Sequence, residues 1–122
     1  MTTTTPPSLV TKRGDVVLVL FPHSDLQTAK PRPALIVQAD DLGTDLSQVI
    51  VAMITSKTFR ANHPSRALVK LESKAGKESG LLVDSVVMTD NLATITTNAV
   101  DRVIGKMSMG KIDKALKHIL GL

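Results

Sequence analysis

The stretch Asp15-Val-Val-Leu-Val-Leu-Phe21 decides the fold class of this sequence. It is apolar and β-branched, it is too short for an amphipathic helix, and Gly14 and Pro22 bound it. These features predict a buried strand. Two similar stretches follow at residues 33–38 and 48–55. A chain that begins with three such segments is expected to be mainly β.

Further short strands are predicted at residues 67–71 and 84–90, with a turn at 74–80 between them. Five or six short strands joined by short turns are typical of a small β-barrel. The C-terminal segment has a different periodicity, because its apolar residues recur at i, i+3, i+4, i+7 and i+8. With Ser108 as N-cap and Gly121 as its end, a helix over 109–120 is expected to lie against the barrel.

Length and composition narrow the classes of protein. The chain has 122 residues, of which 43% are hydrophobic, and this fits one domain with one core. Residues 1–12 are rich in Thr and Pro and are expected to be a disordered tail, so the single domain is placed at 13–122. The formal net charge of +4 favours an anionic partner.

Several classes are excluded by what the sequence lacks. There is no Cys, which removes disulfides, thiol catalysis and Cys-built zinc sites and fits a cytoplasmic location. No secretion signal is recognisable, and no apolar run approaches the roughly 20 residues of a membrane span. Metal-binding and nucleotide-binding motifs are absent, so neither a metal nor another cofactor is expected.

Positive charge is concentrated at residues 57–77, where six Lys and Arg residues face Glu72 alone, a local charge of +5. Such a stretch is either a solvated surface or a binding site for nucleic-acid phosphates. The chain has two Phe and no Tyr or Trp, which argues against nucleic-acid binding by stacking of bases on aromatic side chains. If the chain binds nucleic acid, contacts to the phosphate groups are therefore expected to dominate the binding.

Polar residues follow the predicted strands where functional loops commonly lie. Arg32 precedes a Pro, Thr55 and Ser56 end the third strand, and Asp90 ends a later one. Singly, each is more often structural. Jointly, an arginine, a hydroxyl and a carboxylate beside a basic stretch predict a phosphodiester site, to which His23 could add an acid or a base.

The order and spacing of these segments resemble the MazF/PemK toxin family. The resemblance rests on Lys12-Arg-Gly-Asp-Val-Val-Leu-Val-Leu-Phe-Pro, on Lys30-Pro-Arg-Pro-Ala-Leu-Ile-Val, and on Val51-Ala-Met-Ile-Thr-Ser. It continues through Gly80-Leu-Leu-Val-Asp-Ser-Val-Val-Met-Thr-Asp90 and the final helix, and covers about residues 12–122.

This resemblance implies an SH3-like β-barrel of the MazF/PemK/CcdB type with a C-terminal α-helix, assembled as a homodimer. It implies a toxin of a type II toxin–antitoxin system, an endoribonuclease that cuts single-stranded RNA sequence-specifically without a metal. The products would be a 2′,3′-cyclic phosphate and a 5′-hydroxyl, formed by attack of the substrate's own 2′-hydroxyl. The cognate antitoxin would hold the toxin inactive with a flexible acidic segment.

Residue by residue, Arg32 and Thr55 match catalytic positions of the family, and Asp90 matches an acidic position proposed as a base in the PemK branch. Met88 stands where the PemK branch has Arg, and Ala93 stands where the family commonly has Arg. These departures suggest a branch that relies on Arg32, helped by Lys30 or His23.

Arg32 is expected to stabilise charge on the phosphate, because its guanidinium is planar and always protonated. Thr55 would donate a hydrogen bond to a phosphate oxygen, and Asp90 would accept the proton of the 2′-hydroxyl. The remaining expected contacts to RNA are those of Lys30, Ser56, Lys57, Arg60 and His23.

Two other functions stay open. A CcdB-like toxin would share the architecture and would bind DNA gyrase without catalysis, but the C-terminal Trp of that group is missing here. An inactive SH3-like binding module is the other possibility.

Overall fold

The computed structural model describes residues 10–22 and 29–122. The predicted tail at 1–12 therefore lies almost wholly outside the described residues, and so does His23. Within the described part, strands and short helices follow one another in this order: β1 (Asp15–Pro22), β2 (Ala29–Ile36), β3 (Gln48–Thr55), the 3₁₀-helix η1 (Thr58–Ala61), β4 (Arg66–Val69), α1 (Lys74–Ser79), β5 (Ser85–Thr96), the 3₁₀-helix η2 (Thr97–Ala99), β6 (Val100–Lys106) and α2 (Gly110–Leu120).

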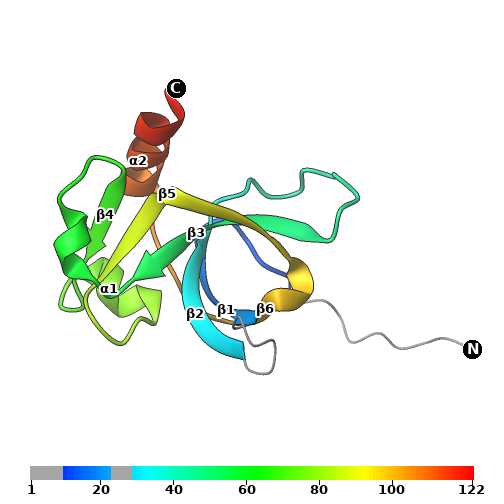
Figure 1. Cartoon of the computed structure of the whole chain (residues 1–122), viewed down its shortest axis with the longest axis horizontal. Helices are drawn as coiled ribbons and strands as arrows, with labels where there is room; N and C mark the ends of the chain where they lie inside the picture. Colours follow the sequence, from blue (N-terminus) through cyan, green and yellow to red (C-terminus); the bar gives the residue numbers. More distant parts are fainter. Residues whose placement is uncertain (1–9, 23–28) are drawn as a thin grey trace, which may run out of the picture.

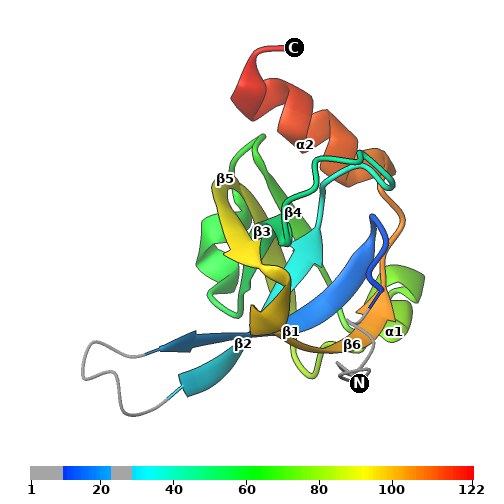
Figure 2. The same cartoon turned by 90° about the vertical axis from the view of Figure 1, so that its right-hand side faces the viewer.

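The strands form one antiparallel sheet in the order β4-β5-β3-β2-β1-β6. The sheet is strongly curved, and α2 lies across one end of it (Figures 1 and 2). The prediction of a mainly β fold with a C-terminal helix is confirmed. The sheet does not close into a complete barrel, however, because β4 and β6 are its two edges in the described part of the chain.

The end of α1 lies against β6, next to this open seam. A Cβ atom added to Gly105 would lie 2.3 Å from the carbonyl carbon of Ser79, and one added to Gly80 would lie 2.0 Å from the carbonyl oxygen of Ile104. Two backbones can approach this closely only where side chains are missing. The contact with α1 therefore covers part of the β6 edge that a closed barrel would have paired with a strand.

The turn predicted at 74–80 is wrong, because residues 74–79 form the helix α1. Ser73 is its N-cap, with a side-chain oxygen that accepts a hydrogen bond from the Gly76 N–H at 3.0 Å. Gly80 ends the helix with a positive φ of 72°. Six residues are too few for a hydrophobic period to be visible in the sequence.

The sheet buries apolar side chains on both faces. Val16 and Val17 are consecutive on β1 and fully buried, yet they belong to different apolar clusters. Because successive side chains of a strand point to opposite faces, these clusters lie on opposite sides of the sheet. Ile112 of α2 belongs to the cluster of Val16, so the helix covers that face.

The predicted C-terminal helix is confirmed to within one residue at its start. Gly121 ends α2 with φ of 70°, as expected, but Met109 rather than Ser108 occupies the N-cap position and no side-chain bond caps this end. β5 continues to Thr96, six residues beyond the predicted end, and β6 was not predicted. No helix in the described ranges is both long and apolar enough to cross a membrane.

Candidate nucleic-acid interface and active site

A groove of about 840 Å³ lies where β2 and β3 diverge. η1, β5, β6 and the α1–β5 connection complete its walls. Among the described residues that line it there is no carboxylate, whereas five cationic side chains line it: Lys30, Arg32, Lys57, Arg60 and Arg102. A concave site lined by positive charges, without negative ones among them, attracts an anionic ligand.

Arg32 and Thr55 lie just beyond the point where the pairing of β2 with β3 ends. The last pair of that ladder is Ala34↔Met53, so each of the two residues lies two positions past it. Pro31 and Pro33 have no N–H to donate, which fits a loss of pairing here. Arg32 lies within β2 and Thr55 ends β3, and both line the groove.

Thr55 also shapes the turn that follows it. Its Oγ1 accepts a hydrogen bond from the Lys57 N–H at 3.2 Å. A hydroxyl that accepts one bond still has its own proton to donate, so Thr55 can offer that proton to a phosphate oxygen in the groove. Ser56 and Lys57, directly after it, are both exposed and both line the groove.

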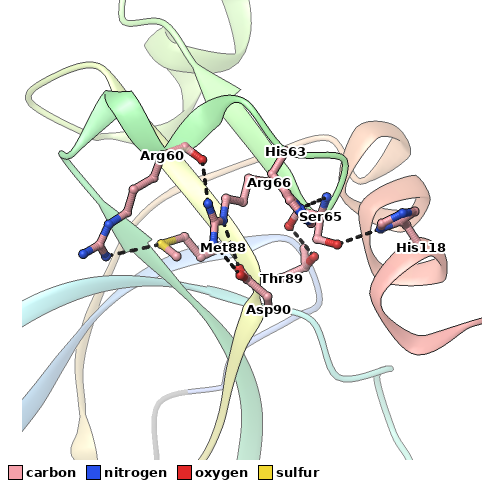
Figure 3. A network of polar contacts seen from close by, with 8 residues as sticks. All are labelled: Arg60, His63, Ser65, Arg66, Met88, Thr89, Asp90 and His118. Atoms are coloured by element: carbon pink, nitrogen blue, oxygen red, sulfur yellow. Dashed lines mark hydrogen bonds and ion pairs between the residues drawn. The ribbon is translucent and has the colours of Figure 1, made fainter.

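Arg60 projects from η1 into the same space. Its Nη1 lies 3.9 Å from the sulfur of Met88, which is itself a lining residue, and its guanidinium carbon lies 5.9 Å from the centre of the Phe59 ring. Phe59 is 78% exposed. Here Met88, at the position where the resemblance implies an arginine in the PemK branch, contacts an arginine from another element (Figure 3).

Asp90 does not join this group. Its carboxylate accepts hydrogen bonds from Arg66, at 2.8 Å from Nη2 and 3.4 Å from Nε, and it is absent from the groove lining. The hydrogen bonds from Arg66 hold the pKa of Asp90 below its ordinary value, against the opposing effect of burial. The same pair raises the pKa of Arg66. A carboxylate so stabilised is a weaker base than an ordinary one.

A bulge in β5 explains this position. Ala52 pairs with Leu92, but the next residue, Met53, pairs with Met88, so residues 89–91 have no partner on β3. Thr89 bonds instead to the residue that precedes β4. Both its N–H and its hydroxyl donate to the carbonyl oxygen of Ser65, at 3.1 and 2.5 Å. The bulge thereby turns Asp90 toward β4 and away from Thr55.

Beyond Thr89, the contacts continue to α2. The Oγ of Ser65 lies 2.8 Å from Nδ1 of His118, and the rings of His63 and His118 meet edge to face at 5.9 Å (Figure 3). Ser65 is fully buried. A serine beside a histidine can be a nucleophile, but a substrate cannot reach one that is enclosed in this way.

The structure brings together most of the residues singled out from the sequence. Six of them line one groove: Lys30, Arg32, Thr55, Ser56, Lys57 and Arg60. Asp90 lies apart in its ion pair, and His23 falls outside the described residues. In the described ranges, no three His, Asp or Glu side chains are grouped to hold a metal ion.

Arg102 and Asn91 are polar lining residues that the sequence did not identify as part of the site. Arg102 lies on β6, where it pairs with Leu18 of β1, and Asn91 lies in the bulge of β5. Their place in the groove depends on how distant strands meet. The only sequence signal for Arg102 was a cation within the strand-like stretch at 100–106, which had not been recognised as a strand.

Comparison with known proteins shows the family of the chain. A family model described as "PemK-like, MazF-like toxin of type II toxin-antitoxin system" matches residues 12–120. Endoribonuclease MazF6 of Mycobacterium tuberculosis is 34% identical over 107 residues, which cover 84% of this chain and 90% of that protein. A probable endoribonuclease MazF of Mycolicibacterium smegmatis is 29% identical over 114 residues, covering 91% and 97%.

Solved structures share the fold. An endoribonuclease in complex with its cognate antitoxin, from a mycobacterial species, superposes with a TM-score of 0.70 at 23% identity, over 93% of this chain and 97% of that one. MazE–MazF of Deinococcus radiodurans gives a TM-score of 0.69 at 17% identity, over the same shares. The resemblance inferred from the sequence is therefore confirmed, and the chain belongs to the PemK-like, MazF-like toxins of type II toxin–antitoxin systems.

Proposed function

We propose that this chain is a toxin that acts as a sequence-specific endoribonuclease, with the cationic groove as its active site. The observation that carries the proposal is that Arg32 and Thr55 line one groove, together with four further cations and no carboxylate in its described part. A polyanion is the ligand that such a lining favours. The curated relatives named above are endoribonucleases, which makes RNA the polyanion to test first.

The proposed reaction uses the 2′-hydroxyl of the substrate as nucleophile. Its oxygen bonds to the adjacent phosphorus while the bond from phosphorus to the 5′-oxygen breaks, which leaves a 2′,3′-cyclic phosphate and a 5′-hydroxyl. The 2′-hydroxyl loses one proton and the 5′-oxygen gains one. No metal takes part in this scheme.

Arg32 and Thr55 act on the phosphate itself. The guanidinium of Arg32 can bond two phosphate oxygens at once and stabilise the charge that builds on them during attack. Thr55 donates its hydroxyl proton to a non-bridging oxygen and fixes the phosphate for in-line displacement. Asp90 has no part in this scheme because it lies outside the groove lining, so the acid–base candidate that remains from the sequence is His23.

The other cations bind the flanking phosphates. Lys30 extends the line of Arg32 on β2, while Lys57 and Arg60 follow Thr55 on the opposite wall. Each phosphate contact on a single strand lowers the slope of log K against log salt by about 0.7. RNA affinity is therefore expected to fall steeply as salt rises.

The same charge pattern suits an antitoxin. A flexible acidic segment would occupy the groove in place of RNA, as a competitive inhibitor, and one structural neighbour is a toxin bound to its cognate antitoxin. Homodimer formation is favoured by apolar side chains left exposed on and after α2, where Leu120 is 55% and Leu122 is 86% exposed. The site of action is the cytoplasm, where messenger RNA is present.

Digestion of a long single-stranded RNA in EDTA tests the proposal. The wild-type protein should give discrete fragments with 5′-hydroxyl ends, and Arg32→Ala should cut at least about 10²-fold more slowly. Lys77→Ala is the matched control, since it removes an exposed cation of α1 that is not part of the groove lining. Failure of the folded, antitoxin-free wild-type protein to cut, or equal cutting by Arg32→Ala, would reject this active site.

A further inference from the structure

The wall of the groove that carries Arg60 is a single short helix. η1 has four residues, from Thr58 to Ala61, and no side chain caps its start. So short a 3₁₀-helix has little stability of its own, because a single turn contains few internal hydrogen bonds and their geometry is poor. Something outside η1 must hold it if Arg60 is to keep one position.

Arg66 supplies that support. Its Nη1 donates to the backbone carbonyl oxygen of Arg60 at 3.2 Å (Figure 3). The same guanidinium uses Nη2 and Nε to bond both carboxylate oxygens of Asp90. The fork geometry of one arginine therefore joins η1 to the bulge of β5.

Asp90 is held in turn by the chain around it. The side chains of Arg66 and Asp90 are 26% and 23% exposed, so each is partly shielded from solvent. Next to Asp90, Thr89 makes two hydrogen bonds to the carbonyl oxygen of the buried Ser65. The Oγ of Ser65 contacts His118 of α2. We call Arg66, Asp90, Thr89, Ser65 and His118 the bracing network.

We propose that Arg66 and Asp90 are positioning residues, which hold η1 so that Arg60 presents its guanidinium to RNA in the groove. This inference rests on the proposed function, because it takes the groove to be the RNA site. It gives Asp90 a different task from the catalytic base suggested by the family pattern. Asp90 acts on RNA only through Arg66 and Arg60 and touches no reacting atom.

A double-mutant cycle between Asp90 and Arg60 tests this arrangement. The probe is the RNA sequence mapped in the digestion, with a 2′-deoxy sugar at the cleavage site so that it binds without being cut. Arg60→Ala should make the slope of log K against log salt less steep by about 0.7 and weaken affinity on the order of five-fold. Asp90→Asn should produce most of this loss by itself, and almost none when Arg60 is already Ala.

The matched control is Asp113→Asn. It breaks the other described ion pair between an arginine and an aspartate, that of Arg13 with Asp113, whose side chains are 28% and 45% exposed, and neither residue lines the groove. Its effect on RNA affinity should be negligible, even if it lowers thermal stability as much as Asp90→Asn. Equal losses of affinity in both variants would mean a general loss of structure and would overturn the proposal.

Kinetics separate a positioning residue from a base. With Asp90→Asn, the KM for RNA should rise several-fold while kcat and its pH profile stay as in the wild type. Additive losses in the cycle, an unchanged affinity, or a fall in kcat with loss of an acid limb would each overturn the bracing role. Arg66→Lys is a second variant should Asp90→Asn fail to fold, since a lysine cannot bond Asp90 and the Arg60 carbonyl together in the same geometry.

The two proposals fail in different ways. If the groove is not the RNA site, the wild-type protein fails to bind the probe or Arg32→Ala cuts normally. If only the bracing role is wrong, the wild-type protein binds and cuts while Asp90→Asn binds the probe equally well.

Discussion

Two arginines of this molecule, Arg32 in the groove and Arg66 in the bracing network, have opposite electrostatic surroundings. Arg32 is exposed, and the lining around it in the described part of the chain contains further cations and no carboxylate. Arg66 lies about one quarter exposed against Asp90, with each polar nitrogen of its guanidinium bonded to a protein oxygen. The first guanidinium is left for a ligand, and the second is used by the fold.

The difference shows which arginine side chain is available to bind an anionic ligand. Cations gathered without carboxylates repel one another and reduce the stability of the folded state, a cost that an anionic ligand removes. An ion pair supported by hydrogen bonds needs no ligand. The two kinds of arginine should therefore respond to substitution in different observables, with Arg32 affecting rate and Arg66 and its partner affecting affinity and stability.

The largest effect is expected for Arg32→Lys. The substitution keeps the positive charge but removes the planar fork that can bond two phosphate oxygens, so kcat should fall by about 10²-fold. Thermal stability should stay within about 1 °C of the wild type, because Arg32 is exposed. Single-turnover cleavage and a thermal melt give both values. Retention of kcat would show that charge alone suffices at this position.

A smaller loss is expected for Thr55→Val. Valine keeps the branched shape at the end of β3 but cannot donate to a phosphate oxygen or accept the Lys57 N–H bond. The rate should fall by about ten- to a hundred-fold, while Thr55→Ser, which keeps the hydroxyl, should retain most of it. Comparing kcat of the two variants isolates the hydroxyl. Equal loss in both would locate the effect in the shape of the strand end.

Arg102→Ala should affect RNA binding alone. It removes the groove cation that lies on β6, so the slope of log K against log salt should become less steep by about 0.7, with kcat at saturating RNA unchanged. Filter binding at several salt concentrations measures the slope. Lys77→Ala is again the control, and an identical slope in Arg102→Ala and wild type would remove Arg102 from the RNA path.

Much of this fold could be predicted because its strands are continuous apolar runs. β3 matches its predicted bounds, and the start of α2 differs from the prediction by one residue. A strand buried on both faces is a continuous apolar run, and a helix buried on one face has a regular apolar period, so both can be recognised in the sequence. α1 and the second half of β5 could not be predicted. α1 has only six residues, too few to show a hydrophobic period, and β5 passes through a polar bulge before its second half.

The residues of the candidate site also divide into those that the sequence could predict and those that it could not. Arg32 and Thr55 could be found because each directly adjoins an apolar strand and matches a family position. The ion pair of Asp90 could not, because the three-residue register shift in β5 depends on how that strand pairs with β3 on one side and β4 on the other. Arg102 could not either, since its place in the same groove as Arg32 requires the order β2-β1-β6 of the finished sheet.

The smallest expected effect concerns stability, and it tests the pairing of Arg66 directly. The pKa of Asp90 lies below its ordinary value in the folded state, so its ionised form stabilises the fold above that ordinary value, about 3.9, and the contribution is lost as pH falls through the lowered pKa. Asp90→Asn should therefore lower Tm by about 1–3 °C at pH 7 and by progressively less below about pH 4. Arg32→Ala should show no such convergence, because the groove around Arg32 has no described carboxylate to titrate. A difference between Asp90→Asn and wild type that persisted undiminished in acid would mean that the carboxylate holds its place by shape rather than by charge, and the contrast between the two arginines would then fail.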